Sequence, residues 1–424
     1  MNGGLSMVEM KSGYKMTEVG VIPEDWEVKN VSESCLIKAR IGWQGLKKSE
    51  YMSSGDYLLI TGTDFDNEQV NWKSCAYVSK ARYEQDSNIK IRPQDILISK
   101  DGTIGKVAYL GMIPKAGTLN SGIFVIRAND RKIDQVFLSK IFMSFYFEEF
   151  LNRLVAGSTI NHLYQKDFVK FCFPLPNSEE QVAIAAALSD VDSLISALTK
   201  KIEKKKAIKQ GLMQQLLTGK KRLPGFNDKW KSMLLGDIAE VKDGTHQTPK
   251  YVKSGGKPFY SVENVTADDF KNVKHISLEE HKALTSNYRM EKGDVLMTRI
   301  GSIGCCKYVD WDVDASFYVS LALLKINEKY DSKFISYLSN IKSFKEEVML
   351  NSLVFAIPQK INLGNISLIK VYIPTSKAEQ TAISNILSDC DSEIAALEEK
   401  RDKYKEIKQG MMQQLLTGKI RLIK

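Results

Sequence analysis

Few residues of this sequence stand in patterns that carry out catalysis. The segment Gly102-Thr-Ile-Gly-Lys106 resembles a phosphate-binding loop, but that loop requires GxxxxGK(S/T), and Val107 stands where the magnesium-binding hydroxyl would be. The Glu-x-Lys triplets at Glu203 and Glu398 lie in charged helical segments, not in a carboxylate cluster that would hold a nuclease's metal. None of the four histidines has sequence partners arranged like a hydrolase triad. We therefore expect no catalytic site in this chain.

Cysteine usage and composition narrow the class of protein further. The six cysteines form no CxxC and have no histidine at zinc-ligand spacing, so we expect free thiols in a reducing cytoplasm and no bound metal. The longest apolar run, Val182–Leu188, is far shorter than the ~20 residues that span a bilayer, so we expect no membrane partner. A net charge of +9 favours a polyanionic partner.

The elements that must position any functional residues include a stretch that occurs twice. Residues 180–223 and 379–422 align at a shift of about 199 positions, and about 29 of the 44 aligned residues are identical. Both copies begin with a capping-box pattern and end at a glycine suited to a helix C-terminus. The capping pairs are Ser178 with Gln181 and Ser376 with Glu379, and the glycines are Gly219 and Gly418. These signals predict two helices of about 38 residues, each about 57 Å long.

Apolar residues form one stripe along each predicted helix, at spacings that alternate between four and three. The predicted seam consists of Ile184, Leu188, Val191, Ile195, Leu198 and Ile202 in the first copy and Ile383, Leu387, Cys390, Ile394 and Leu397, then Arg401 and Tyr404, in the second. Such a heptad seam predicts that the two helices pair as an antiparallel coiled coil. The alternative is that each helix packs only on its own globular part.

The remaining sequence forms two globular parts with the same plan. Strand-like runs such as 57–60, 96–99, 106–110 and 122–127 precede a helical patch at 136–155. The loop 294–304 repeats the loop 95–105 at the same shift, although the parts otherwise differ. We expect a mixed α/β fold, with two pseudo-twofold-related modules separated by the coiled coil. The expected segments are a loose N-terminal segment (1–20), a first module (21–176), a first helix (177–220), a second module (221–375) and a second helix with a tail (376–424).

Taken together, these features resemble the specificity subunit of type I restriction–modification systems. The resemblance rests on Pro23-Glu-Asp-Trp26, on Gly244-Thr-His-Gln-Thr-Pro-Lys-Tyr251, on the two loops just described, and on the helix end QQLLTGK-x-RL, which occurs twice. It covers about residues 21–424. The first module departs from the pattern, because IGWQGLKKSE (41–50) lacks the Thr-x-x-Pro of the second copy.

The resemblance implies a DNA-binding protein that is not itself an enzyme. Each module would be a target-recognition domain that reads one half of a bipartite double-stranded DNA sequence, and the coiled coil would set the distance between the halves. Two modification subunits would dock on the coil and use S-adenosylmethionine, and restriction subunits would use ATP and Mg²⁺. A base-methylating subunit needs an (N/D)PP(Y/F) motif to hold the flipped base, and this chain has no Pro-Pro.

Candidate DNA contacts are basic and hydrogen-bonding residues of the loops, because Lys and Arg bind phosphates and Arg, Gln, His and Thr reach base edges. The candidates are Arg40, Gln44, Lys47, Lys48, Lys100, Thr103 and Lys106 in the first module and Thr245, His246, Gln247, Thr248, Lys250, Tyr251, Arg299 and Ser302 in the second. The loop glycines would allow close backbone approach. A glycine pair between two strands is also typical of a plain turn. The basic run 200–209 fits the exposed face of the coil or a subunit interface better than a DNA contact.

The leading hypothesis is therefore a non-catalytic, sequence-specific DNA-recognition subunit. The alternative is an interaction scaffold that has the same fold but does not read sequence. Equal affinity for random and selected duplexes would favour the scaffold.

Overall fold

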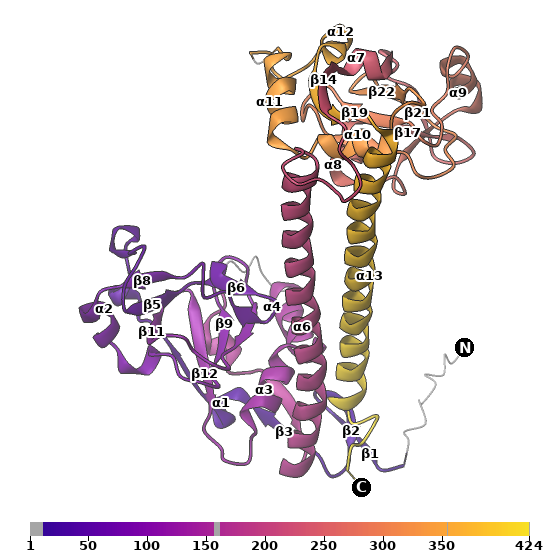
Figure 1. The fold of residues 1–424 in the computed structure, drawn as a ribbon. Helices are drawn as coiled ribbons and strands as arrows, with labels where there is room; N and C mark the ends of the chain where they lie inside the picture. The colour runs from indigo at the N-terminus through magenta and orange to yellow at the C-terminus, as the bar shows by residue number, and fades with distance from the viewer. Residues whose placement is uncertain (1–11, 157–161, 354, 424) are drawn as a thin grey trace, which may run out of the picture. The chain divides into compact units, whose positions relative to one another are not determined.

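The computed structural model describes residues 12–156, 162–353 and 355–423. The chain divides into two compact units (Figure 1). The first contains the residues up to Ala197 and those from Lys400 onward, and the second contains Leu198–Glu399. Each unit consists of one globular module together with one half of each long helix.

The first module is built from short strands and helices between Tyr14 and Leu175. Its strands are β1 (Tyr14–Thr17), β2 (Gly20–Pro23), β3 (Glu27–Asn30), β4 (Cys35–Ala39), β5 (Tyr57–Ile60), β6 (Phe65–Asp66), β7 (Gln69–Val70), β8 (Ala76–Val78), β9 (Ile96–Ser99), β10 (Val107–Tyr109), β11 (Gly117–Leu119), β12 (Ile123–Ala128) and β13 (Cys172–Leu175). Its helices are α1 (Val31–Ser34), α2 (Lys80–Glu84), α3 (Gln135–Phe142), α4 (Phe145–Ala156) and α5 (Gln165–Phe168), and short 3-10 turns are η1 (Gly42–Gln44), η2 (Lys48–Glu50), η3 (Gly62–Asp64) and η4 (Ser87–Ile89). The predicted strands at 57–60 and 96–99 are confirmed at both ends.

A four-stranded antiparallel sheet of order β10-β9-β12-β4 forms the centre of this module. Its strand β9 is buried on both faces, because successive side chains of a strand point to opposite sides. Ile96 and Ile98 face one apolar cluster, and Leu97 faces the other. The second cluster is covered by the sheet β11-β5-β8, in which β11 and β5 run parallel. The module is thus a layered α/β fold.

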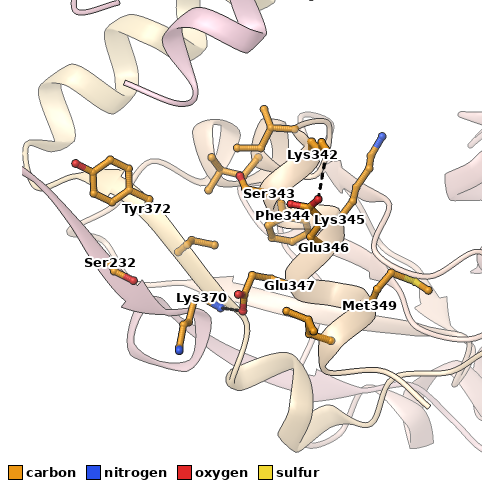
Figure 2. A pocket seen from close by; sticks show the side chains of 14 residues that line it. Ser232, Lys342, Ser343, Phe344, Lys345, Glu346, Glu347, Met349, Lys370 and Tyr372 are labelled. Atoms are coloured by element: carbon orange, nitrogen blue, oxygen red, sulfur yellow. Dashed lines mark hydrogen bonds and ion pairs between the residues drawn. The ribbon is translucent and has the colours of Figure 1, made fainter. Parts of the chain in front are cut away.

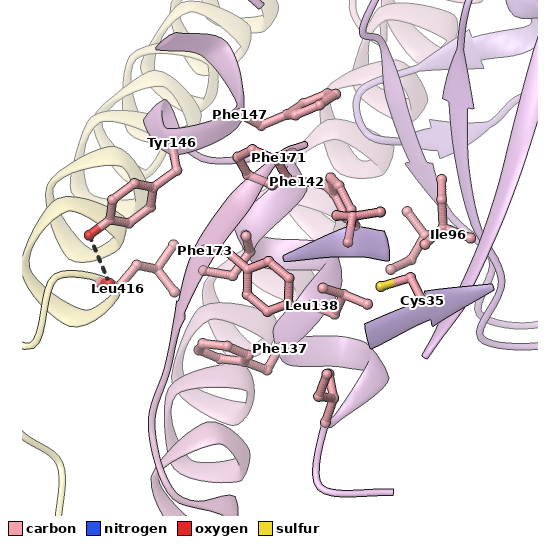
Figure 3. Close-up of a cluster of buried hydrophobic side chains, with 14 of the residues drawn as sticks. Cys35, Ile96, Phe137, Leu138, Phe142, Tyr146, Phe147, Phe171, Phe173 and Leu416 are labelled. Carbon is pink, nitrogen blue, oxygen red and sulfur yellow. Dashed lines mark hydrogen bonds between the residues drawn. The ribbon is translucent and has the colours of Figure 1, made fainter. Parts of the chain in front are cut away.

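The larger cluster of the first unit is rich in phenylalanine (Figure 3). Phe147 stands edge-on to Phe142 and Phe171, with ring centroids 5.3 and 5.2 Å apart. This geometry suits the aromatic quadrupole. Tyr146 in α4 donates a hydrogen bond to the carbonyl of Leu416, 3.4 Å away, and Leu416 is itself fully buried. The core of the first module therefore includes residues that come from the far end of the chain.

The long helices are α6 (Ser178–Leu216) and α13 (Lys377–Leu415). In the first unit, the beginning of α6 packs antiparallel to the end of α13. Ile184 and Leu188 share a cluster with Leu415, and Lys408 of α13 forms ion pairs with Asp192 of α6 at 2.8 Å and with Glu68. Burial lowers the pKa of Lys408, but the two carboxylates more than offset this and hold the pKa above its ordinary value.

A buried carboxylate fixes the start of α6. Glu180 is fully buried and accepts a hydrogen bond from Trp26 Nε1 at 3.0 Å. Arg421, in the tail after α13, donates to both oxygens of Glu180, from Nε at 2.7 Å and from Nη2 at 2.8 Å. Arg421 also binds Asp25 and holds the pKa of that carboxyl below its ordinary value. The ion pair compensates for the burial of the charge.

The second module repeats the plan with different dimensions. Its strands are β14 (Trp230–Leu234), β15 (Ala239–Asp243), β16 (Tyr251–Val252), β17 (Lys257–Tyr260), β18 (Lys274–Ile276), β19 (Val295–Thr298), β20 (Cys306–Tyr308), β21 (Ser316–Phe317), β22 (Leu321–Ile326) and β23 (Lys370–Pro374). Its helices are α7 (Leu235–Ile238), α8 (Val262–Ala267), α9 (Leu278–Leu284), α10 (Ser332–Leu338), α11 (Lys342–Leu350) and α12 (Leu363–Ser367). The central sheet has the order β15-β22-β19-β20, which corresponds strand for strand to that of the first module.

The second unit repeats the helix contacts as well. Ile383 at the start of α13 shares a cluster with Leu216 at the end of α6. Lys205 pairs with Glu393 at 2.6 Å. The buried Glu379 accepts two hydrogen bonds from Arg222, at 2.6 and 2.8 Å, and one from Trp230 at 3.4 Å. In both units, therefore, the two helices run antiparallel and an arginine that follows one helix binds the glutamate that begins the other.

The helix predictions need one correction. Asn177, not Ser178, caps α6. Its side-chain oxygen Oδ1 accepts a hydrogen bond from the N–H of Glu180 at 2.9 Å. At the start of α13, the Ser376 hydroxyl accepts a hydrogen bond from the N–H of Glu379 at 3.4 Å. The Glu379 side chain does not bind the Ser376 N–H in turn, because its carboxylate accepts hydrogen bonds from Arg222 and Trp230. The capping box is thus replaced by the buried ion pair. The C-terminal glycines, Gly219 and Gly418, have positive φ as predicted.

The predicted seam side chains are placed as follows. Those that are buried are Ile184, Leu188, Leu198, Ile202, Ile383, Leu387 and Ile394, and those that are half-buried are Val191, Ile195, Cys390, Leu397 and Tyr404. Helix α6 also holds one stretch that is long and apolar enough, by length and composition alone, to cross a membrane. In this fold, residues of α6 such as Ile184 and Leu188 pack in the protein core.

Candidate nucleic-acid interface

The loops that follow β9 and β19 are built in the same way in the two modules. The Ser99 carbonyl accepts a hydrogen bond from the N–H of Gly105 at 2.8 Å, and the Ser99 hydroxyl accepts one from the N–H of Lys106 at 2.9 Å. Thr298 does the same for Gly304 at 2.8 Å and Cys305 at 2.9 Å. A hydroxyl residue at the end of the strand therefore ties each loop back on itself, which explains the S/T in the duplicated motif.

The glycines of these loops have two different roles. Gly102 and Gly301 have positive φ, and no heavy atom of the described residues lies within 4 Å of where a Cβ would be. Gly105 and Gly304 also have positive φ, but a Cβ there would collide with Leu151 or crowd Val348. We expected both glycines of each loop to allow a ligand to approach the backbone. The structure leaves open space for this at the first glycine only, because the second packs on α4 or α11.

Basic residues of the loops are not equally available. In the first loop, Thr103 and Lys106 are exposed, whereas Lys100 is half-buried with its Nζ 5.2 Å from the Phe124 ring centroid, and burial lowers its pKa. In the second loop, Ser302 is exposed but Arg299 is buried.

Arg299, which the sequence made a candidate DNA contact, is buried in this structure. It donates from Nη1 to Asp243 Oδ1 at 2.6 Å and from Nε to the carbonyl of Ile361 at 3.3 Å. Because the side chain is 8 % exposed and already bound, its role in this conformation is to hold three segments together.

Two first-module candidates, Arg40 and Gln44, are buried as well. Arg40 is 2 % exposed and donates to the carbonyl of Leu119 at 2.8 Å and the hydroxyl of Thr118 at 3.0 Å, and burial lowers its pKa. Gln44 is also buried, and its Oε1 has no hydrogen-bond partner among the described residues. Lys47 and Lys48, which flank the start of η2, remain exposed.

The second module presents a polar segment between β15 and β16. Its exposed members are His246, Gln247, Thr248, Lys250 and Tyr251, and Thr245 is half-buried. The backbone of Thr245 is fixed by bonds to Phe317 at 3.1 Å and Val319 at 2.9 Å. Gly244 must be glycine, because a Cβ would collide with the Tyr318 backbone. The segment is therefore anchored at one end and free to present side chains at the other.

Asp243 joins this polar segment to the β19–β20 loop. Its Oδ2 lies 2.7 Å from His246 Nε2, and its Oδ1 accepts from Arg299. The loop is joined in turn to residues 359–361, because Gly301 donates to the carbonyl of Gln359 at 2.8 Å and Ile361 donates to that of Arg299 at 2.9 Å. Segments 244–251, 299–304 and 355–361 therefore form one continuous region, which we call the second-module surface.

The first module has a matching connection. Leu163 donates to the carbonyl of Lys100 at 2.8 Å, and the His162 ring hydrogen-bonds to the Asp101 carboxylate. His162 and residues 355–361 were not among the sequence-based candidates. Each follows the helix, α4 or α11, that packs on the second glycine of the recognition loop. This shared position after the helix could have identified them from the sequence.

The duplicated architecture corresponds to a known family. A family model described as type I restriction modification DNA specificity domain matches residues 23–210 and again 227–409. The chain belongs to this family. The first match contains the first module from Pro23 onward, the second contains the second module, and each includes most of the long helix that follows.

Relatives of this specificity family resemble the chain over nearly its whole length. A protein of Methanocaldococcus jannaschii assigned as the MjaX type I restriction enzyme specificity subunit is 28 % identical, with 97 % of each chain covered. The MjaVIII specificity subunit of the same organism is 26 % identical over 95 % of this chain and 94 % of its own. The crystal structure of a type I restriction–modification S subunit from M. genitalium is 17 % identical and superposes with a TM-score of 0.63, covering 92 % of this chain and 96 % of that one. This last likeness shows the fold.

The second module also contains a large cavity. It measures about 1030 Å³ and lies in the second module between α11 and the strands β14 and β23 (Figure 2). Its described lining contains no His, Cys or Asp. Glu346 pairs with Lys342 at 3.4 Å, and Glu347 accepts the N–H of Lys370 at 3.1 Å. Both glutamates of the lining are therefore already engaged within the module.

A Ser-His-Asp grouping in the second module is structural. The His281 ring lies between Ser316 Oγ, 3.0 Å from Nδ1, and Asp314 Oδ1, 2.9 Å from Nε2. Sequence order did not reveal this contact. A hydrolase triad needs an accessible serine, but Ser316 is 3 % exposed within β21. Among the described residues, no group of three or more His, Cys, Asp and Glu side chains is arranged to hold a metal ion.

Proposed function

We propose that this chain is the DNA-specificity subunit of a type I restriction–modification complex, in which each module reads one half of a bipartite double-stranded target. The observation that carries the proposal is a duplicated loop framework that presents unlike side chains. At matching loop positions the first module offers Thr103 and Lys106, and the second offers Ser302 and Cys305. Two modules that share a scaffold but differ in their exposed side chains can recognise two different DNA half-sites.

Within the second-module surface, the contacts assigned to bases and phosphates are those whose side chains are exposed. They are His246, Gln247, Thr248, Lys250, Tyr251 and Ser302, and the exposed first-module counterparts are Lys47, Lys48, Thr103 and Lys106. Gln suits adenine, whereas the lysines suit phosphates. Arg40, Gln44, Lys100 and Arg299 have the supporting role that their burial implies.

The long helices present the same exposed residues twice, which supports docking of two copies of one partner. Near the ends of the helices, in residues 207–215 and 406–414, the pairs that are both identical and exposed are Ile208 and Ile407, Gln210 and Gln409, Gly211 and Gly410, Gln214 and Gln413, and Gln215 and Gln414. Packing within the chain does not require exposed positions to match. The partner assigned to each copy is one modification subunit, and the length of the paired helices sets the gap between half-sites.

The chemistry of such a complex belongs to its other subunits. The cofactors S-adenosylmethionine, ATP and Mg²⁺ are assigned to modification and restriction subunits, and the complex to the cytoplasm, where its DNA lies. The second candidate function is a scaffold of the same fold without sequence readout. The exposed hydrogen-bonding segment 245–251 favours readout, since docking of other subunits does not require it.

The test is a map of adenine methylation in the host genome, with and without the gene for this chain. The expected result is a bipartite motif with a fixed gap that disappears on deletion. A chain in which Gln247, Thr248 and Lys250 are replaced by alanine should lose or relax one half of the motif and keep the other. An unchanged map after deletion would reject the proposal, and a map that persists in this variant would reject the assigned contacts.

A further inference from the structure

The second-module surface ends in an apolar tip. Phe355 is 98 % exposed and Ile357 is 100 % exposed, and Leu353 at the base of the tip is 41 % exposed. A phenylalanine and, two residues later, an isoleucine are thus left without the burial that normally stabilises such residues. Because hydrogen bonds from Leu353 to Lys360, at 2.8 Å, and from Ala356 to Leu353, at 3.0 Å, fold the tip back on itself, the two side chains are held in a defined loop.

The tip is bonded directly to the loop assigned to DNA. Gly301, whose surroundings are open, donates to Gln359, and Ile300 and Lys360 pair across the junction. Arg299 binds both the Ile361 carbonyl and Asp243, next to the 244–251 segment. A duplex that contacts Ser302 and Gly301 therefore lies within reach of the tip.

Charge around the tip suits a nucleic acid. Residues 348–370 contain two lysines, Lys360 and Lys370, and neither Asp nor Glu. Lys360, which is exposed, closes the loop. An apolar tip beside a lysine matches the wedges with which DNA-binding proteins part stacked base pairs.

We propose that Phe355 and Ile357 insert at a base step of the half-site read by the second module and partly unstack it. The inference rests on the proposed function and adds a specificity element to it. Flexible pyrimidine–purine steps unstack most readily, so the wedge would favour such a step at its position without a hydrogen bond to either base.

The first module differs in sequence at the corresponding place. At a shift of 198 residues, which relates Lys360 to His162, Gly157 and Thr159 stand where the second module has Phe355 and Ile357. The wedge is therefore assigned to one half-site. The chain itself supplies the contrast, because a step that opens in the second half-site should have no counterpart in the first.

The test uses the full-length chain, bound to its modification subunits, and duplexes of the mapped target that carry 2-aminopurine at successive adenine positions. The modification subunits flip the adenines that they methylate, so those positions carry no label. At the remaining positions, binding of the unaltered chain should raise fluorescence at one position of the second half-site and at none of the first. The variant F355A/I357A should lose this signal and bind the target about tenfold more weakly or worse. The matched control L278A removes an exposed leucine of the same module and should change neither quantity.

Other outcomes distinguish failure of the wedge from failure of the proposed function. If the unaltered chain does not prefer its target to a scrambled duplex, the proposed function fails and the wedge fails with it. If it does prefer the target but F355A/I357A keeps both the fluorescence signal and the affinity, the wedge alone is wrong. Loss of modification subunits from the variant, with DNA affinity of the free chain unchanged, would make the tip a protein contact and overturn the inference. Because both side chains are exposed, thermal unfolding of the variant should match that of the unaltered chain.

Discussion

Arg421 holds the carboxylate of Glu180 with two hydrogen bonds, of 2.7 and 2.8 Å, although 241 residues separate them in the chain. Arg222 holds Glu379 in the same way. In each case the glutamate is fully buried and also accepts from a tryptophan. The duplicated helices therefore exchange their tails, and each module is completed by a residue from the tail of the other helix.

Replacing Arg421 by alanine should destabilise the first unit strongly. The change leaves Glu180 buried without its cation, and breaking a buried pair on one side costs about 3–5 kcal/mol. Urea unfolding, followed by tryptophan fluorescence, measures the loss. R222A should give a similar loss in the second unit, and R92A, at an exposed position, serves as the control. Unfolding of R421A at the same urea concentration as the unaltered chain would contradict the assigned role.

The two glycines of the first recognition loop should respond differently to alanine. G105A adds a collision with Leu151 to the strain of positive φ, and should cost about 2–4 kcal/mol of stability. G102A pays the strain alone, about 1 kcal/mol, but adds a methyl group where a duplex would approach the backbone. We expect G102A to lower DNA affinity more than it lowers stability. Equal stability losses in the two variants would disprove the division of roles.

The exposed isoleucines of the long helices should each support one docked modification subunit. Replacing either Ile208 or Ile407 by aspartate introduces a charge into an apolar contact, so the single variants should bind one subunit and the double variant none. Mass measurement of the assembled complex gives the ratio. The control is A207E, which places at an exposed position the residue that the second copy has there, Glu406. Two subunits on the double variant would rule out this docking surface.

Cysteine labelling offers a test of the surface that needs no substitution. Cys305 is exposed in the second recognition loop, whereas burial raises the pKa of Cys35 and of Cys75 to about 12. Because the thiolate is the reactive form, a maleimide at pH 7.5 should modify Cys305 long before Cys35 or Cys75. Target DNA should slow modification of Cys305, and a scrambled duplex should slow it less. Equal rates with and without target would remove Cys305 from the DNA-facing surface.

Sequence patterns predicted the architecture well where a single local force decides it. Ile96–Ser99 is a strand because three consecutive apolar residues, Ile96–Ile98, follow a turn, and the long helices follow from their seams. Burial of the polar candidates was not predictable in this way. Arg299 matches Lys100 in the motif, but the end of β19 turns its side chain toward Asp243 and away from solvent. Phe355 and Ile357 lie in an apolar run that resembles a core strand, and only the tertiary fold shows them exposed.

The exchange of helix tails also affects the order in which the protein is made. Residues 198–399 form the second unit and leave the ribosome as one continuous stretch, so that unit can fold while translation continues. The first unit needs residues 400–424, which are synthesised after all of the second. The module that emerges first from the ribosome is therefore the one completed last, and until Arg421 arrives the nascent chain carries Glu180 without its cation.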